Sequence, residues 1–445
     1  MSGFDLIVRG GVIVNHAGRG DGDVGITAGV ITAIGDLATA SAGQVIDARG
    51  LHVLPGVIDT QVHFREPGKE YKEDLETGSR AAALGGVVAV FEMPNTDPST
   101  TTLDALNDKL ARARNRMHVD HAFYAGAAAD NIADLIEMER AAGCCGIKIF
   151  MGASTGSLLV QSDEDVTRVL SAARRRVAIH SEDEYRMTER RELARAGDWT
   201  SHPEVRDVES AVRCTRRLLA IAQRLKRRIH VLHISTAEEL PLLAAARDVA
   251  TCEVLPNHLT LAAPEAYQRL QGKAQQNPPI RDGRHRTALW GAVRGGLIDV
   301  LGSDHAPHTS EEKARPYPQS PSGTPGVQTL VAVMLTHVAE GRLSLERFVD
   351  LTSTSPQRVF QLQGKGRLAL GYDGDLTLVD LAARRVITDA QQASRAGWTP
   401  FDAMTAKGWP IATIVRGQVV MRDDELVTPA IGEPIRFLET MAQAM

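Results

Sequence analysis

Between residues 56 and 362 the sequence alternates short apolar runs with amphipathic stretches, and this alternation constrains the fold more than any other feature. Such apolar runs are typical of strands buried on both faces of a sheet, and the stretches between them are typical of helices. The runs predict eight strands, at 56–63, 85–93, 119–125, 146–151, 176–181, 229–235, 250–256 and 297–305. Helices are predicted between them, among others at 102–116, 131–142, 163–175, 207–226 and 236–247.

Eight parallel strands joined by helices predict closure of the sheet into a (β/α)₈ TIM barrel. An open doubly wound sheet is the alternative, but the first strand is not followed by a Gly-x-Gly-x-x-Gly turn. In a barrel the residues at the carboxyl ends of the strands form the active site. The polar residues that follow each apolar run are therefore the candidates for function.

The two ends of the chain have a different pattern. Residues 1–55 contain short bursts such as DLIVRGGVIV, and residues 363–445 return to that style in GDLTLVD and PIATIVRGQVVM. Val, Ile and Gly with closely spaced turn residues indicate antiparallel strands. We therefore expect an α/β protein in which 1–55 and 363–445 form one small β-sandwich and 56–362 form the barrel.

The composition argues against several classes of protein. A formal net charge of −5 gives no global bias toward nucleic acid or an anionic membrane. The four cysteines contain no CxxC pair, which argues against a disulfide framework and a cysteine zinc site. No signal-like start and no apolar window of 18 residues is present. We expect a cytoplasmic enzyme with a small-molecule substrate and neither a nucleic-acid nor a membrane partner.

Polar residues gather at the carboxyl ends of the predicted strands. In chain order they are Gln61, His63, Arg65, Asn95, Lys148, His180, His233, Asn257, His258, Asp304, His305 and His308. A single histidine after an apolar run is more often a hydrogen-bonded strand-end residue than a ligand, so only the joint pattern carries weight. His63, His180, His233 and Asp304 offer the nitrogen and oxygen ligands that zinc accepts.

Three of these residues have simpler explanations that the residues alone leave open. Lys148 lies within the apolar burst CCGIKIF, where an ammonium is costly unless it is paired with an acid or chemically changed. Arg65 could form a salt bridge with Glu66 or Asp59. Asn95 in PNTDP has the chemistry of a turn residue.

A set of motifs in fixed order makes the pattern more specific. GVIDTQVHFREPG, GGVVAVFEMPNTDP, GIKIFMGAS, VAIHSEDE, VLHISTAEE, NPPIR and LGSDHAPHTSEEK closely resemble the dihydroorotases of the amidohydrolase superfamily. The resemblance covers nearly the whole chain and is strongest to the bacterial class I type, which is related to allantoinases and hydantoinases. It implies a (β/α)₈ barrel, a β-sandwich made from both chain ends, and one or two zinc ions at the barrel mouth.

The resemblance also implies the metal ligands. His63 and Asp304 would hold the more buried zinc, His180 and His233 would hold the second, and Lys148, N-carboxylated by carbon dioxide, would bridge them. Gln61 stands where the family usually has its first histidine, and its carbonyl oxygen could be a weak ligand. Some relatives bridge the metals with an aspartate just before a glycine, but this chain reads Thr155-Gly156 there, which favours Lys148 as the bridge.

The substrate residues follow from the same resemblance. Arg65, Asn95 and His308 would bind a substrate carboxylate, and Asn277 in NPPIR would contact the substrate directly. Asp304 would be the catalytic acid and base of a metal-assisted hydrolysis of a ring amide. The implied reaction interconverts N-carbamoyl-L-aspartate and L-dihydroorotate in de novo pyrimidine biosynthesis.

Two other functions stay open. One is a different cyclic amide hydrolase, of the allantoinase or hydantoinase type. The other is a non-catalytic homologue retained as a partner of aspartate transcarbamoylase, which only Gln61 supports, whereas the five other expected ligands are all present. We also expect a homo-oligomer, with aspartate transcarbamoylase association as an open alternative.

Overall fold

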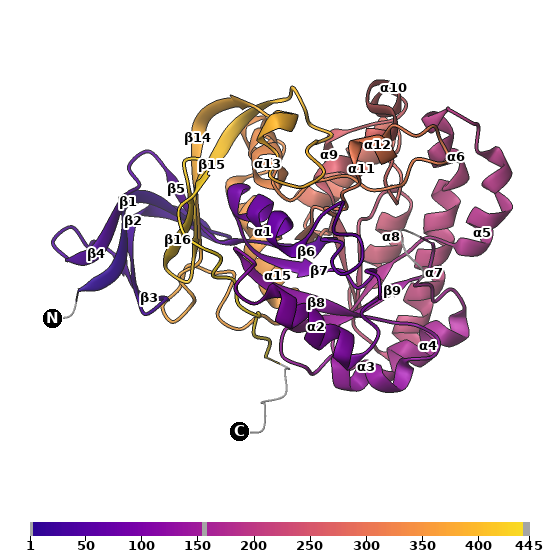
Figure 1. Cartoon of the computed structure of the whole chain (residues 1–445), viewed down its shortest axis with the longest axis horizontal. Coiled ribbons are helices and arrows are strands. Elements are labelled where there is room, and N and C mark those ends of the chain that lie inside the picture. The colour runs from indigo at the N-terminus through magenta and orange to yellow at the C-terminus, as the bar shows by residue number, and fades with distance from the viewer. Residues whose placement is uncertain (1–2, 154–157, 439–445) are drawn as a thin grey trace.

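The computed structural model describes residues 3–153 and 158–438, and its larger helical part is built on a sheet of eight parallel strands (Figure 1). Neighbours in the sheet follow each other in the sequence, from β6 to β13. The strands are β6 (Val57–Val62), β7 (Val87–Glu92), β8 (Asp120–Gly126), β9 (Cys144–Phe150), β10 (Val177–His180), β11 (Ile229–Val231), β12 (Ala250–Val254) and β13 (Val300–Leu301). Each lies within or overlaps one of the eight predicted apolar runs.

The sheet closes between its first and last strands. Just beyond β6, the backbone N–H of His63 donates to the carbonyl of His305 at 2.7 Å, and Val62 and His305 form a parallel bridge. This contact joins the two edges of the sheet at their carboxyl ends. The predicted (β/α)₈ barrel is confirmed, as a barrel that is nearly closed.

Helices surround the barrel, and their sequences explain where they begin. The side chains of Thr102, Ser162 and Asp207 cap the N-termini of α2, α4 and α7, and Asp74 forms a capping box at α1. The helices are α1 (Leu75–Leu84), α2 (Leu103–Ala113), α3 (Ile132–Met138), α4 (Asp163–Ala172), α5 (Glu184–Glu189), α6 (His202–Val205), α7 (Val208–Leu225), α8 (Glu239–Ala244), α9 (Pro256–Thr260), α10 (Glu265–Leu270), α11 (Gly283–Arg294), α12 (Ser310–Lys313), α13 (Leu330–Ala339), α14 (Leu345–Val349) and α15 (Ser355–Phe360).

The second sheet is mixed and is built from both ends of the chain. Strand β5 pairs antiparallel with β14, with Val53 opposite Leu378, and so joins the N-terminal strands to the C-terminal ones. Its strands are β1 (Phe4–Asn15), β2 (Gly18–Thr27), β3 (Val30–Gly35), β4 (Ala42–Asp47), β5 (His52–Pro55), β14 (Leu376–Val386), β15 (Thr405–Val415), β16 (Gln418–Arg422) and β17 (Glu425–Leu426). It has a hydrophobic core of its own, separate from that of the barrel.

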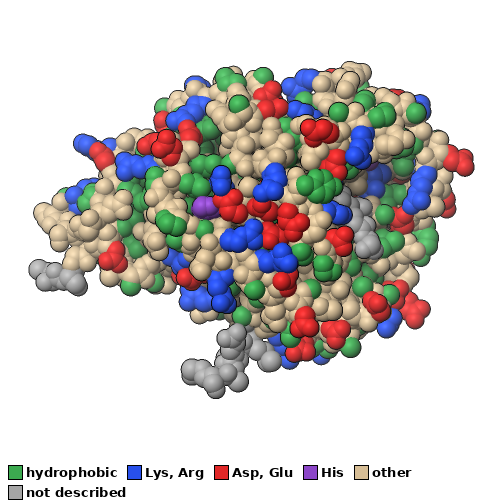
Figure 2. Space-filling view, in the orientation of Figure 1, with side chains coloured by type: hydrophobic (Ala, Val, Ile, Leu, Met, Phe, Trp, Pro, Cys, Tyr) green, Lys and Arg blue, Asp and Glu red, His purple; other side chains and the backbone are tan. Residues whose placement is uncertain are grey.

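The surface agrees with the small net charge of the sequence. On the face seen in Figure 2, Lys and Arg side chains alternate with Asp and Glu rather than forming a field of one sign. Within the described residues, no helix combines the length and apolarity needed to cross a bilayer.

A buried ion cluster connects the barrel to the terminal sheet. Nζ of Lys365, a residue that is 3% exposed, lies 2.6 Å from a carboxylate oxygen of Asp120 at the start of β8. It also lies 2.6 Å from Asp375 and 3.1 Å from Asp373, both of which precede β14. Arg416, just after β15, forms a further ion pair with Asp120. One ammonium therefore compensates three carboxylates where the two sheets meet.

Replacing Lys365 by methionine should destabilise the protein strongly, because it leaves these buried carboxylates facing one another without their shared cation. We expect the free energy of unfolding to fall by about 3–5 kcal/mol in urea denaturation. The control is Lys407→Met, which removes an exposed pair with Glu340 at 3.4 Å and should cost no more than about 1 kcal/mol. Equal effects of the two substitutions would contradict the role of Lys365.

Candidate active site

A small, polar pocket lies at the carboxyl ends of the barrel strands. All of the predicted site residues except His308 line it, so closure of the barrel brings them together. The lining residues are Gln61, His63, Arg65, Asn95, Lys148, Phe150, His180, His233, Asn277, Asp304, Ala306, Ser322 and Gly323. The other strand-end residues, Asn257, His258 and His305, are buried outside this lining and hydrogen-bond to neighbouring groups.

Three lining residues have a backbone conformation that side-chain-bearing residues rarely adopt. The φ angles of Arg65, His233 and Asp304 are +64°, +39° and +47°. Such strain persists only where surrounding structure enforces it, and it concentrates at functional sites. Each residue follows a barrel strand, so the local turn directs its side chain toward the cavity.

The first pair of potential metal donors consists of His63 and Asp304. Nδ1 of His63 lies 2.7 Å from Oδ1 of Asn95 and donates to it, which leaves Nε2 with a lone pair. That Nε2 lies 3.2 Å from Oδ1 of Asp304, which also accepts from Nε2 of Gln61 at 3.0 Å. Burial lowers the pKa of His63 and so favours the neutral ring. Two acceptor atoms therefore face each other, an arrangement suited to a cation between them.

The second pair consists of His180 and His233. Nδ1 of His180 lies 3.0 Å from Nε2 of His233, and burial lowers the pKa of both rings. The other nitrogen of His180, Nε2, lies 2.9 Å from Oε2 of Glu182. Burial alone would raise the pKa of Glu182, but the Arg206 guanidinium and His180 outweigh it and the net shift is downward. A charged carboxylate thus orients His180, as carboxylates commonly orient metal-binding histidines.

Lys148 lines the same cavity as these pairs and is 1% exposed. Burial lowers the pKa of its ammonium to about 7, although the charges of Asp304 and Glu253 act to raise it. Its Nζ lies 4.4 Å from the centre of the Phe150 ring, and none of the described carboxylates is within ion-pair distance. The salt bridge considered for Lys148 is therefore not formed. Thr155-Gly156, the other place considered for a bridging ligand, lies outside the described residues.

The donor atoms fit a metal centre only if side chains of other kinds complete it. Within residues 3–153 and 158–438, no three His, Cys, Asp or Glu side chains form a group able to hold a metal ion. The two donor atoms, however, are 3.2 Å apart in the His63–Asp304 pair and 3.0 Å apart in the His180–His233 pair. Two ligands of one tetrahedral zinc lie about 3.3 Å apart, given bonds of about 2.0–2.1 Å. Oε1 of Gln61 and Nδ1 of His233 are buried without a hydrogen-bond partner, and Lys148 and Gln61 supply the remaining candidate ligands.

Arg65 places a buried positive charge beside these donors. It is 2% exposed, its Nε donates to the carbonyl of Pro307 at 3.2 Å, and burial lowers its pKa to about 10. The alternative salt bridge to Glu66 is not formed, because Glu66 pairs with Arg116 instead. No described carboxylate lies within ion-pair distance of Arg65. An anionic ligand in the cavity would supply the missing counter-charge.

His308 lies behind Arg65 rather than in the cavity lining. Its Nε2 lies 3.0 Å from the carbonyl of Ser322 and 3.4 Å from Nη2 of Arg65. Nζ of Lys72 lies 3.0 Å from its Nδ1. Nδ1 therefore accepts from Lys72 and Nε2 donates to Ser322, so both ring nitrogens already have hydrogen-bond partners in the protein.

Several residues of the site were not predicted. Glu182 could have been suspected, since it follows His180 by two residues in HSEDE, and carboxylates often orient metal-binding histidines. Lys72 and Trp398 had no such signal, because they reach His308 from segments far away in the sequence.

Comparison with known proteins agrees with this fold. Residues 52–420 match the Amidohydrolase family. A dihydroorotase from Methanosarcina acetivorans is 37% identical, over 92% of this chain and 90% of its own length. An allantoinase from Rubrobacter xylanophilus is 34% identical, over 98% of each chain. The structure of an L-hydantoinase (dihydropyrimidinase) from Arthrobacter aurescens superposes with a TM-score of 0.93 at 30% identity, covering 97% of this chain and 99% of that one. The chain belongs to the amidohydrolase family.

Proposed function

We propose that the chain is a zinc-dependent cyclic amide hydrolase, and specifically a dihydroorotase that interconverts N-carbamoyl-L-aspartate and L-dihydroorotate. The observation that carries this choice is Arg65, a buried cation in the cavity lining without a described carboxylate partner. Among the substrates named by the relatives, dihydroorotate offers a ring carboxylate that a guanidinium can hold with two parallel hydrogen bonds. The names of several relatives at 34–38% identity support the same choice.

The chain's own residues would act on the two ends of such a substrate. Arg65 would hold the carboxylate, and the amide of Asn277 would hydrogen-bond the ring. Oδ1 of Asp304 accepts from Gln61 and faces Nε2 of His63 as a potential metal donor, so its other oxygen, Oδ2, is the atom available to take a proton from the attacking water. The same oxygen would deliver that proton to the ring nitrogen as the amide bond breaks. Zinc, held by the two donor pairs, would supply an activated water at neutral pH and polarise the ring carbonyl.

Lys148 would complete the metal centre after reaction with carbon dioxide. A pKa of about 7 leaves a large share of its side chain as the neutral amine, which is the form that attacks carbon dioxide. The new N–C bond gives a carbamate and releases one proton. The product would be an anion with two oxygens, so the modification would replace an uncompensated buried cation with a metal ligand.

A cyclic amide hydrolase with a different substrate is the second candidate, because the fold closely matches an L-hydantoinase. Hydantoin and allantoin carry no ring carboxylate, so they offer Arg65 no counter-charge. The choice between these substrates therefore depends on Arg65.

Substrate preference tests the proposal directly. We expect the wild-type enzyme to hydrolyse dihydroorotate with a higher kcat/KM than hydantoin or allantoin. Arg65→Met should raise the KM for dihydroorotate about 10- to 150-fold, as expected for losing a charged hydrogen-bond partner, while bound zinc is retained. The control is Arg213→Met, which removes only an exposed pair with Glu209 on α7. Preference of the wild type for hydantoin or allantoin would refute the assignment.

Removing the Lys148 amine tests the proposed metal bridge. Lys148→Met should lower the zinc content per chain and reduce kcat at least about 100-fold, because even residues that only support metal ligands cost 10- to 100-fold. Zinc is measured by elemental analysis after dialysis, and circular dichroism checks the fold. A variant with the zinc content of the wild type would show that Lys148 is not a ligand.

A further inference from the structure

We propose that the segment between β14 and β15, residues 387–404, positions the carboxylate-binding Arg65 through Trp398 and so sets the affinity for substrate. We call this segment the C-terminal strap. The inference rests on the proposed function, since it concerns how that substrate is held. In Figure 1 the strap leaves the terminal sheet between β14 and β15 and extends toward the barrel.

Trp398 is the point at which the strap reaches the site. It is 0% exposed, and its Nε1 donates to the backbone carbonyl of His308 at 2.8 Å. The preceding carbonyl, that of Pro307, accepts from Nε of Arg65 at 3.2 Å. Trp398 and Arg65 therefore bind adjacent carbonyls of the same short loop, and a shift of that loop would carry both contacts with it.

The side chain of His308 also packs against Arg65. Its Nε2 donates to the Ser322 carbonyl at 3.0 Å and lies 3.4 Å from Nη2 of Arg65, so this second approach is a packing contact between two donors. The hydrogen bond that ties the guanidinium to this loop is therefore the one from Nε to the carbonyl of Pro307. Arg65 also has a positive φ of +64°, so its own backbone leaves little freedom to follow a displaced loop.

A second part of the strap holds the other end of the same loop. The hydroxyl of Ser394 and the backbone N–H of Arg395 both donate to the carboxylate of Glu73. That carboxylate lies 3.2 Å from Nε2 of His305, the residue whose carbonyl closes the barrel against His63. The loop from 305 to 308 is therefore connected to the strap directly at His308 and through Glu73 at His305.

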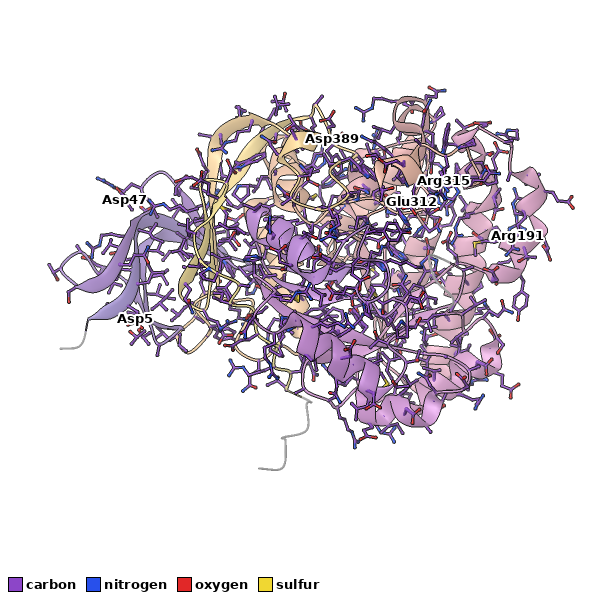
Figure 3. The ribbon with its side chains drawn as sticks, viewed as in Figure 1. Asp5, Asp47, Arg191, Glu312, Arg315 and Asp389 are labelled. Carbon is purple, nitrogen blue, oxygen red and sulfur yellow. The ribbon has the colours of Figure 1, made fainter. Side chains whose placement is uncertain are left out.

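The indole of Trp398 also packs near a lysine that organises the cavity wall. Nζ of Lys313 lies 5.8 Å from the centre of the indole ring. It donates to the carbonyls of Gln275, Pro321 and Gly323 at 3.0, 2.7 and 2.9 Å. Gly323 lines the cavity, so Trp398 also contacts a lysine that holds this part of the cavity wall. A second lysine, Lys273, forms an ion pair at 2.9 Å with Asp389 of the strap, a residue labelled in Figure 3.

Trp398 is a positioning residue, because its described contacts are with protein groups and it is not part of the cavity lining. Trp398→Phe keeps an aromatic ring in place but removes the N–H donor to His308. We expect a 3- to 10-fold rise in the KM for dihydroorotate, about the worth of one hydrogen bond, with little change in kcat or zinc content.

A double-mutant cycle separates this role from general destabilisation. KM is measured in the zinc-loaded wild type, Trp398→Phe, Arg65→Met and the double variant. If Trp398 acts through Arg65, its effect on KM disappears in the Arg65→Met background. The control is Trp409→Phe, which removes an indole N–H bonded to Asp424 at 2.7 Å in the terminal sheet and should leave KM unchanged.

A second strap variant keeps the test possible if Trp398→Phe does not fold. Arg395→Ala removes the ion pair between the strap and Asp74, and its KM effect should be smaller but equally dependent on Arg65. An unaltered KM in both strap variants, or an increase that persists without Arg65, would overturn the inference while leaving dihydroorotase activity established. Absence of dihydroorotate turnover in the wild type would overturn the proposed function and, with it, this inference.

Discussion

Closure of the parallel sheet is the constraint on which the rest of this structure depends. The bond from the His63 N–H to the His305 carbonyl joins the first strand to the segment after the last. Residues that are more than 200 positions apart thereby come to one rim, where His63 faces Asp304 at 3.2 Å. The same closure places the Arg65 backbone near the loop that carries Pro307 and His308. A site of this kind cannot be assembled from any one segment of the chain.

The buried positive charges of Lys365, Arg65 and Lys148 differ in whether carboxylates surround them. This difference separates a residue that holds the fold together from residues of the candidate site. Lys365 is fully surrounded by carboxylates and serves to join the two sheets. Arg65 and Lys148 are equally buried, yet no described carboxylate pairs with either. An unpaired buried charge is costly unless a ligand or a chemical change compensates it. In the proposed enzyme the substrate carboxylate would compensate Arg65, and carboxylation would remove the charge of Lys148.

The sequence predicted the fold and most of the cavity lining, since both follow from local patterns. Apolar runs located all eight barrel strands, and barrel geometry then placed the strand-end residues together. The predictions for 229–235 and 297–305 were too long, because β11 ends at Val231 and β13 at Leu301, shortly before His233 and Asp304, where φ is positive. The position of His308 behind Arg65 and the contact from Trp398 depend on long-range packing, which no local pattern encodes.

Gln61 decides how firmly the first donor pair can hold a metal, since its amide donates to Asp304 instead of offering a third nitrogen ligand. The most direct test is therefore zinc content per chain together with dihydroorotate turnover, in the wild type and in Gln61→His. We expect that the active wild type keeps one zinc through dialysis and loses a second, and that Gln61→His retains both. A wild type that binds no zinc and does not turn over dihydroorotate under zinc saturation would contradict this expectation.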